Sequence, residues 1–433
     1  MKRLNSFLIL LMPLAIYYDF PFTTINISTT LSFLFLVNSL VIPKERNVKT
    51  NKYLIGILLY FVASTIAVFF LGHSIPFIHF IFVAINIIIY VFLTGNVHDI
   101  IDVKFFFGNY KRICFILISF FAIQHLISIL TGRILFGLNP FLPISDSYKG
   151  VGFGLSNKTY PYYYSIRLMS SLFSEPSHFA VYLLPLFVIS LCERERINWF
   201  LFGVTSFTIL LTLSGNGILA SVVLLISFLL LNKKLSITKR IGSLIGVGLI
   251  LLLVFLILNN ISVFNGLFSN LFIGGLNRGS KADYRVFRGF YIFGTMPSLN
   301  KLVGLGFNQL TNYLSTNNIA TPFDYATSNV EYANFVAQFM IYFGFIGLAL
   351  LILFAISLFR KSNYYSRTFF ITTIALWFST SMMFDSVWVF LLTFVVVFNS
   401  IEWRVCYGIE NKQRVIIANR NKINPVGNTS LLY

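Results

Sequence analysis

Residues 332–359 read YANFVAQFMIYFGFIGLALLILFAISLF, and this stretch decides the fold class. None of its 28 residues is Asp, Glu, Lys, Arg or His. A helix of about 20 consecutive apolar residues is long enough to cross the hydrocarbon core of a bilayer. The stretch therefore predicts a transmembrane helix.

The same pattern recurs along the whole chain. Of its 433 residues 57% are hydrophobic and 11% are charged, whereas about 25% are charged in a typical soluble domain. We predict an all-α, polytopic integral membrane protein, with a membrane domain over residues 1–403 and a basic tail over 404–433. Twelve spans are expected, at 6–20, 27–43, 53–72, 75–95, 113–131, 176–192, 197–212, 216–231, 241–259, 332–359, 368–383 and 386–402.

The first span begins like a signal peptide, because Met1-Lys2-Arg3 precede an apolar stretch. No small-residue cleavage site follows it; Tyr17-Tyr18-Asp19 stand there instead. We therefore expect a retained first helix.

The distribution of basic residues predicts the orientation. With the N-terminus inside, the inner segments hold 23 of the 32 Lys and Arg residues. Basic residues favour the cytosolic side, so both termini are expected there. The net charge of +18 has the same origin, and it indicates attraction to anionic lipid headgroups rather than to nucleic acid.

Two of the expected outer loops are long, at 132–175 and 260–331, and long connections are usually functional. In the second loop, Arg285 and Arg288 are three positions apart within a segment rich in aromatic residues. This pattern predicts an interfacial helix on the outer leaflet.

Glu175 is the most informative residue of the first outer loop. It precedes Pro176, which suits the first position of a helix, and His178 follows in the first turn. Free N–H groups of Ser177, His178 and Phe179 at this terminus would attract an anion such as phosphate. With Arg167, these residues predict a chemical site at the outer mouth; the alternative is a Glu that only caps the helix.

The densest outer basic cluster consists of Arg278, Lys281, Arg285 and Arg288. Arg can hold phosphate in a bidentate manner, although contact with lipid headgroups is the alternative. The tyrosines at 160–164 are expected in an interfacial aromatic belt rather than against a sugar.

The remaining polar residues do not indicate a further functional site. His73, His79 and His125 do not have metal-ligand spacing, and Asp385 is expected to be structural. Cys114, Cys192 and Cys406 are given no role. No Lys, Arg, Asp or Glu lies in the centre of a predicted span, which disfavours ion-coupled transport.

These features together resemble the Wzy-type O-antigen polymerases, which are related to the O-antigen ligases. Arg167…Ser171-Leu-Phe-Ser-Glu175-Pro-Ser-His178-Phe is similar to the family's Arg…Ser-x-Phe-x-Glu-Pro segment. Arg278 and Gly289 fit its Arg-x10-Gly pattern, and Gly304-Leu-Gly306-Phe with residues 329–347 is similar to its closing segment.

The resemblance implies a GT-C-like glycosyltransferase in the bacterial inner membrane, with a periplasmic site and no cofactor or metal. A glycan on undecaprenyl pyrophosphate would be transferred to the non-reducing end of the next lipid-linked repeat unit. Glu175 or His178 would be the base, whereas the pyrophosphate would be bound by Arg167, Arg278, Arg285 and Arg288. A polysaccharide chain-length regulator is an implied partner.

Three alternatives remain open. An O-antigen ligase would use the same donor and topology but transfer the glycan to lipid A–core. A flippase for lipid-linked oligosaccharides would be expected to carry charges in a central cavity. A structural membrane scaffold would leave the cluster around Glu175 unexplained.

Overall fold

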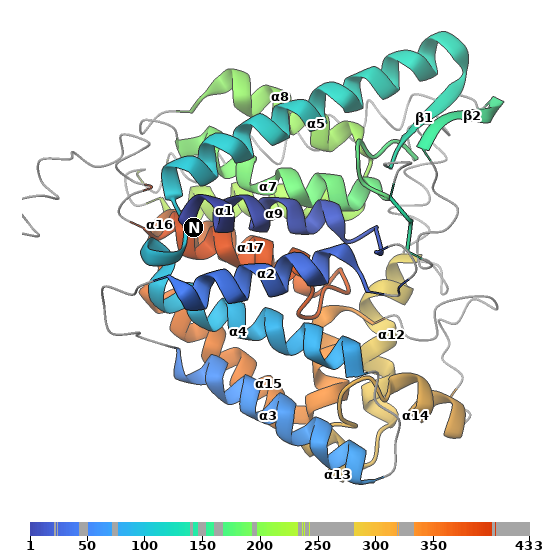
Figure 1. Ribbon diagram of the computed structural model, residues 1–433, viewed down its shortest axis with the longest axis vertical. Helices are drawn as coiled ribbons and strands as arrows, with labels where there is room; N and C mark the ends of the chain where they lie inside the picture. Colours follow the sequence, from blue (N-terminus) through green and yellow to red (C-terminus); the bar gives the residue numbers. More distant parts are fainter. Residues whose placement is uncertain are drawn as a thin grey trace, which may run out of the picture.

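The computed structural model describes residues 1–20, 23, 25–42, 51–71, 77–138, 142–145, 153–159, 168–192, 197–232, 236, 238, 242, 281–317, 319, 333–400 and 403. These residues form a bundle of helices (Figure 1). Its helices are α1 (Lys2–Ala15), α2 (Ile27–Val41), α3 (Lys52–Phe70), α4 (Phe77–Ile100), α5 (Val103–Thr131), α7 (Pro176–Cys192), α8 (Trp199–Leu211), α9 (Gly215–Leu231), α12 (Lys281–Thr295), α13 (Ser298–Val303), α14 (Leu310–Thr316), α15 (Phe335–Lys361), α16 (Tyr364–Trp377) and α17 (Ser386–Phe398).

Eleven of the twelve predicted spans coincide in whole or in part with one of these helices. The remaining span, 241–259, lies outside the described residues apart from Gly242, as does the predicted tail 404–433. The helix predicted around Arg285 and Arg288 is present as α12; its position at the membrane interface remains a prediction.

Helix also fills most of the segment between the predicted spans 75–95 and 113–131, with a break in helical geometry at Asn96 (φ −140°, ψ 31°), directly after the predicted end of the first of them. α4 continues to Ile100 and α5 begins at Val103, so this region is almost entirely helical. The reason is local: the Asp102 side chain accepts a hydrogen bond from the N–H of Phe105 at 3.0 Å. A capped helix can start directly after the preceding helix ends.

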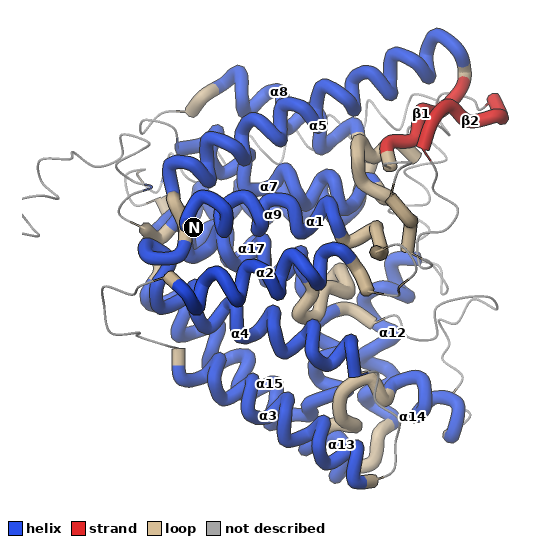
Figure 2. Tube along the Cα trace, in the orientation of Figure 1, coloured by secondary structure: helices blue, strands red, loops and turns tan. Residues whose placement is uncertain are grey.

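The first long loop contains two strands, so the all-α prediction needs correction there. β1 (Arg133–Gly137) and β2 (Phe153–Thr159) pair antiparallel, with Leu135 opposite Leu155 (Figure 2). Gly132, in the left-handed conformation with φ 66°, ends α5 and turns the chain into β1.

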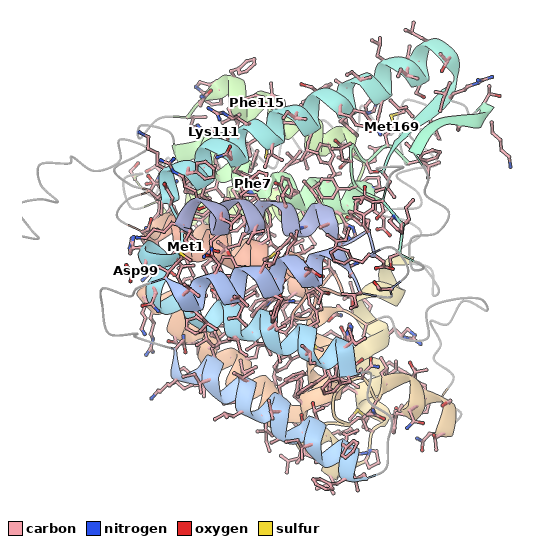
Figure 3. All side chains as sticks on the ribbon, in the orientation of Figure 1. Met1, Phe7, Asp99, Lys111, Phe115 and Met169 are labelled. Atoms are coloured by element: carbon pink, nitrogen blue, oxygen red, sulfur yellow. The ribbon has the colours of Figure 1, made fainter. Side chains whose placement is uncertain are left out.

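The helices run between two ends of the bundle. Met1, Asp99 and Lys111 lie at one end, called here the Met1 end, and Met169 lies at the other (Figure 3). Tyr17 lies just after the end of α1. Its carbonyl accepts a hydrogen bond from the N–H of Ser145, in the segment after β1, at 2.9 Å. We call this opposite end the Tyr17 end; the hairpin, α12 and α14 lie there (Figure 1).

Side-chain caps fix where many helices begin. An N-cap side chain has to replace the hydrogen bonds that a helix cannot supply to its first N–H groups. Eight of the described helices begin in this way, at Asn26, Asn51, Asp102, Asn198, Ser214, Asn334, Asn363 and Asp385.

α7 and α17 form the centre of the bundle. Eleven of the 13 residues of α17 are buried, and α7 is buried from Phe179 to Leu191. The Tyr182 and Phe390 rings stack between the two helices, with centroids 4.8 Å apart and planes at 11°. Because interiors are close-packed, this contact gives the start of α7 a rigid support.

The surface indicates a membrane environment. Among the described helices, α3, α4, α5 and α15 are long and apolar enough to cross a membrane, and five shorter apolar helices accompany them. Large apolar side chains are exposed on their surfaces; Phe70, for example, is 82% exposed. Lipid covers such side chains without the cost that water would impose. The chain is a multi-pass membrane protein.

Gly344 offers a test of the packing between α13 and α15. Its φ of 60° and ψ of −163° suit glycine, and an added Cβ would collide with the carbonyl oxygen of Leu302. We expect Gly344→Ala to lower the free energy of unfolding by about 2–3 kcal/mol, measured as a loss of melting temperature in detergent.

The matched control is Gly203→Ala, within α8, where an added Cβ meets no atom within 4 Å. We expect this substitution to be neutral or stabilising by up to about 1 kcal/mol. Equal effects of the two substitutions would contradict the packing described around Gly344.

Candidate functional site

The segment before α7 is held in place by α5. The N–H of Ser171 donates to Oε1 of Gln124 at 2.8 Å, and Nε2 of Gln124 donates back to the Ser171 carbonyl at 3.2 Å. The Ser171 hydroxyl donates to the carbonyl of Leu117 at 2.7 Å. These bonds fix Ser171 with a φ of 57°, a conformation that non-glycine residues seldom adopt.

Glu175 lies directly after this fixed segment and is exposed. Its Oε2 accepts from the Ser177 hydroxyl at 3.0 Å. Pro176 is the first residue of α7, as the sequence predicted. The Glu175 carboxylate is therefore exposed at a fixed position directly before α7.

The prediction that three N–H groups are free at this terminus was wrong. The N–H groups of His178 and Phe179 both donate to the carbonyl of Glu175, at 3.2 and 3.4 Å. Of the three, the Ser177 N–H is the one without a hydrogen bond to a described residue. The start of α7 therefore offers an anion fewer backbone donors than expected.

His178 is anchored to α1. Its Nδ1 lies 2.7 Å from the hydroxyl of Tyr17, and the two rings stack with centroids 5.8 Å apart and planes at 25°. Tyr17 is fully buried and meets Phe173 edge to face, with centroids 6.2 Å apart. The hydrogen bond and the stacking together set the orientation of the imidazole, so His178 belongs to a pair rather than standing alone.

The first long loop is also attached to the end of α1. The N–H of Asp19 donates to the carbonyl of Pro143 at 2.9 Å, and Tyr18 forms a β-bridge with Ile144. Nδ2 of Asn26 closes the turn by donating to the carbonyl of Ile16 at 2.6 Å. Tyr17 therefore lies where α1, α7 and this loop meet.

Arg288 has a different setting from the one predicted. The sequence placed it on a surface face of an interfacial helix, but its side chain is only 2% exposed. α12 packs closely on α15. Glycine at position 289 permits this approach, because an added Cβ would collide with Ala333 and Ala337. Asn334 joins the two helices by donating to the carbonyl of Val286 at 2.8 Å. A guanidinium keeps its charge when buried, so Arg288 brings a fixed positive charge to the Tyr17 end.

The other predicted basic residues lie outside the described part of the chain. Arg167 and Arg278 are not among the described residues, and the side chains of Lys281 and Arg285 on α12 are likewise outside them. The structure thus describes Glu175, His178 and Arg288 from the predicted set. α12 and the start of α7 lie at the same end of the bundle (Figure 1).

Strained backbone collects at this end. The four described non-glycine residues with positive φ are Ser171, Leu213, Asn308 and Phe384. Ser171 precedes α7, and the other three lie in the connections α8–α9, α13–α14 and α16–α17, which by the order of the helices are at the Tyr17 end. Such conformations cost about 1–3 kcal/mol each and cluster at functional sites. This distribution favours the Tyr17 end as the working face.

Sequence reasoning missed two residues of this arrangement. Tyr17 was considered only as an obstacle to signal cleavage, and Gln124 was not assigned to the site. A lone amide in an apolar helix was the available signal for Gln124, because polar groups in membrane helices seek partners. No comparable signal marked Tyr17.

The described histidines do not assemble a metal site. His79 stacks on Phe307 with centroids 5.5 Å apart, and His125 meets Phe121 edge to face at 4.5 Å. His73 lies outside the described residues. Within the described ranges, no group of three or more His, Cys, Asp or Glu could hold a metal ion.

Comparisons with known proteins assign no family: no protein-family model matches the chain, and no curated protein matches it.

Asp385 is a half-buried acid in the turn between α16 and α17. Its Oδ1 accepts from the N–H of Trp388 at 2.8 Å, which makes it the N-cap of α17. Burial raises the pKa of the Asp385 carboxyl to about 6, although the N–H groups of Trp388 and Val387 act in the opposite direction. The ordinary value is 3.8.

This shift predicts a pH dependence of stability. Because the folded pKa is raised, the folded state binds the proton more tightly, so stability is greatest below about pH 4 and falls as the pH rises to about 6. The fall amounts to at most about 3 kcal/mol. Asp385→Asn keeps a good N-cap and should remove this fall, measured as melting temperature between pH 4 and pH 7. An unchanged pH profile would contradict the assignment to Asp385.

Proposed function

We propose that this chain is a membrane glycosyltransferase of the Wzy type, a polymerase of lipid-linked oligosaccharide repeat units. The observation that carries the proposal is the presentation of Glu175 and His178 at the start of α7. The resemblance of residues 167–179 to the polymerase segment adds to it. In this proposal the Tyr17 end faces the periplasm, as the distribution of basic residues predicts.

The reaction needs a base at the acceptor sugar. The attacking hydroxyl of the lipid-linked repeat must lose a proton as its oxygen forms the new glycosidic bond. Glu175 is exposed, and His178 is oriented by Tyr17, so either group can take that proton. Both lie at the start of a helix whose body is buried, Glu175 directly before it and His178 in its first turn, which keeps their positions fixed.

The reaction also needs stabilisation of the leaving group. The bond between the donor sugar and undecaprenyl pyrophosphate breaks, and negative charge develops on the departing diphosphate. Because α7 offers few free N–H groups, this task falls mainly to arginine. Arg288 is the described candidate, and Arg167, Arg278 and Arg285 are proposed with it on sequence alone.

Deletion of the gene, followed by a gel of surface polysaccharide, tests the proposal. A polymerase deletion leaves a single repeat unit, and the wild-type gene restores the ladder. A ligase deletion removes even the single repeat, whereas a flippase deletion leaves the lipid-linked repeat on the cytosolic side. An unchanged ladder would place the protein outside this class of reaction.

Glu175→Ala is the first variant to add back. We expect it to lower polymerisation by about 10²–10⁴-fold, because a positioned acid–base group contributes that much. The matched control is Lys158→Ala, which removes an exposed charge from β2 at the same end of the bundle. The proposal fails if both variants give wild-type ladders at equal amounts of protein in the membrane.

Tyr17→Phe separates orientation from chemistry. This change removes one hydroxyl and keeps the ring that stacks on His178. We expect about a tenfold loss of polymerisation rate, the value of one well-placed hydrogen bond, and a larger loss for His178→Ala. If His178→Ala retains the wild-type rate while Glu175→Ala does not, Glu175 alone is the base.

A further inference from the structure

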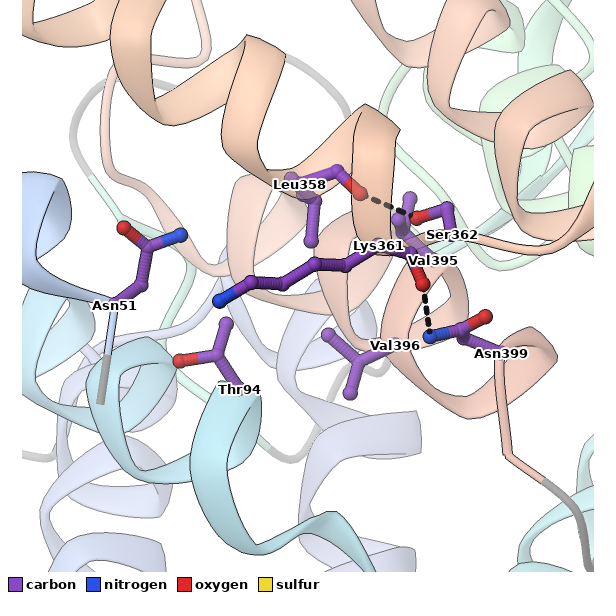
Figure 4. Close-up of a pocket in the computed structure, with 8 residues that line it drawn as sticks. All are labelled: Asn51, Thr94, Leu358, Lys361, Ser362, Val395, Val396 and Asn399. Atoms are coloured by element: carbon purple, nitrogen blue, oxygen red, sulfur yellow. Dashed lines mark hydrogen bonds between the residues drawn. The ribbon is translucent and has the colours of Figure 1, made fainter. Parts of the chain in front are cut away.

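The described structure contains a small cavity far from the candidate site, at the Met1 end. Its volume is about 110 Å³. Figure 4 shows the Lys361 side chain extending from the end of α15 toward Asn51 and Thr94, with Leu358 and Val396 beside it. The full lining is Asn51, Thr94, Leu358, Lys361, Ser362, Val395, Val396 and Asn399.

Among the described residues that line the cavity there is one cation, Lys361, and no acid. Lys361 is exposed at the cavity, and its ammonium makes no hydrogen bond or ion pair with any described residue. Arg360 and Lys52 are next in sequence to lining residues and are both exposed. An anion entering here meets the Lys361 ammonium, with no carboxylate in the described lining.

Helix ends of both signs surround the cavity: the start of α3, and the ends of α15 and α17, whose C-caps Ser362 and Asn399 belong to the lining. α3, with 19 residues, begins at Lys52, and its N-cap Asn51 lines the cavity, so the positive end of its dipole lies there. Side-chain donors offset part of the negative ends: Asn363 donates to the carbonyl of Phe398 at the end of α17 at 2.7 Å, and the end of α15 has similar partners. Arg367 donates to the carbonyls of Phe359 and Arg360, at 3.0 and 3.3 Å, and Asn399 donates to that of Lys361 at 3.1 Å.

The surroundings indicate a lipid rather than a soluble anion. One wall of the cavity is apolar, formed by Leu358, Val395 and Val396. Leu59 on α3 and Ile356 on α15 are exposed, at 64% and 43%, on the helices that flank it. A cationic mouth beside an apolar wall matches a headgroup phosphate followed by glycerol and the start of an acyl chain.

We infer that this cavity binds the headgroup phosphate of an anionic phospholipid in the leaflet at the Met1 end. The Lys361 ammonium faces the phosphate, the start of α3 adds its dipole, and the apolar wall contacts the lipid backbone. This inference does not depend on the reaction proposed for the Tyr17 end.

Native mass spectrometry of the purified full-length protein tests the inference, with phosphatidylglycerol and phosphatidylcholine as probes. We expect the protein to retain phosphatidylglycerol more tightly than phosphatidylcholine. Lys361→Gln should weaken phosphatidylglycerol binding about fivefold, because one Lys near a phosphate contributes about that much. Raising the ionic strength should reduce the preference.

Two further variants make the test specific. Lys104→Gln removes an equal charge from an exposed position of α5 at the same end but outside the cavity, and should leave binding within about twofold. Thr94→Phe fills the cavity while keeping Lys361, and should weaken binding as Lys361→Gln does. Melting temperatures confirm that each variant is folded.

Three results would overturn the inference. Equal losses for Lys361→Gln and Lys104→Gln would show diffuse surface attraction, and undiminished binding in folded Thr94→Phe would show that the cavity is not the site. Displacement of phosphatidylglycerol by an equal concentration of inorganic phosphate would identify a site for free phosphate rather than for a lipid.

Discussion

The constraint on which the structure depends is that backbone polar groups in lipid must find partners within the protein. No water is available in the hydrocarbon core, so the spans are helices and their unsatisfied groups are confined to the ends. The caps at Asn51, Asp102, Asn334 and Asp385 satisfy part of this requirement and fix where the connections begin. Polar chemistry is consequently concentrated at the two ends of the bundle, and each end has its own character.

At the Tyr17 end, the connections are structured by contacts with the bundle. Gln124 holds the segment before α7, Tyr17 holds His178, and Asn334 attaches α12 to α15. These contacts impose positive φ at Ser171 and bury Arg288, both of which are costly without a compensating role. At the Met1 end the groups are simpler, with basic side chains around helix termini and a small cavity. The asymmetry agrees with a bundle that reacts at one face and meets anionic lipid at the other.

Sequence reasoning predicted much of the fold because apolar runs of sufficient length permit few alternatives. The prediction was incomplete where short-range interactions determine the ends of helices and the structure of a loop. It did not show that helix resumes after the break at Asn96 as far as Ile100, nor that Asp102 caps the next helix directly afterwards. It also missed the hairpin β1–β2, because its register is set by Gly132 and by contacts to α5 rather than by alternation of apolar residues.

The candidate site was predicted only in part. Glu175 and His178 could be selected because charged residues are rare near the spans, and Pro176 marked the helix start. Tyr17 could not be selected, since its partner is 161 positions away in the sequence. The burial of Arg288 depends on Gly289 fitting against Ala333 and Ala337, a three-dimensional fit that helical spacing alone does not reveal.

The central claim is that the Tyr17 end joins lipid-linked repeat units. It is tested most directly by placing the purified protein in liposomes with a single lipid-linked repeat as sole substrate. The account predicts a ladder of longer glycans, with one undecaprenyl pyrophosphate released for each new linkage. The absence of both products with folded, correctly inserted protein would contradict the account.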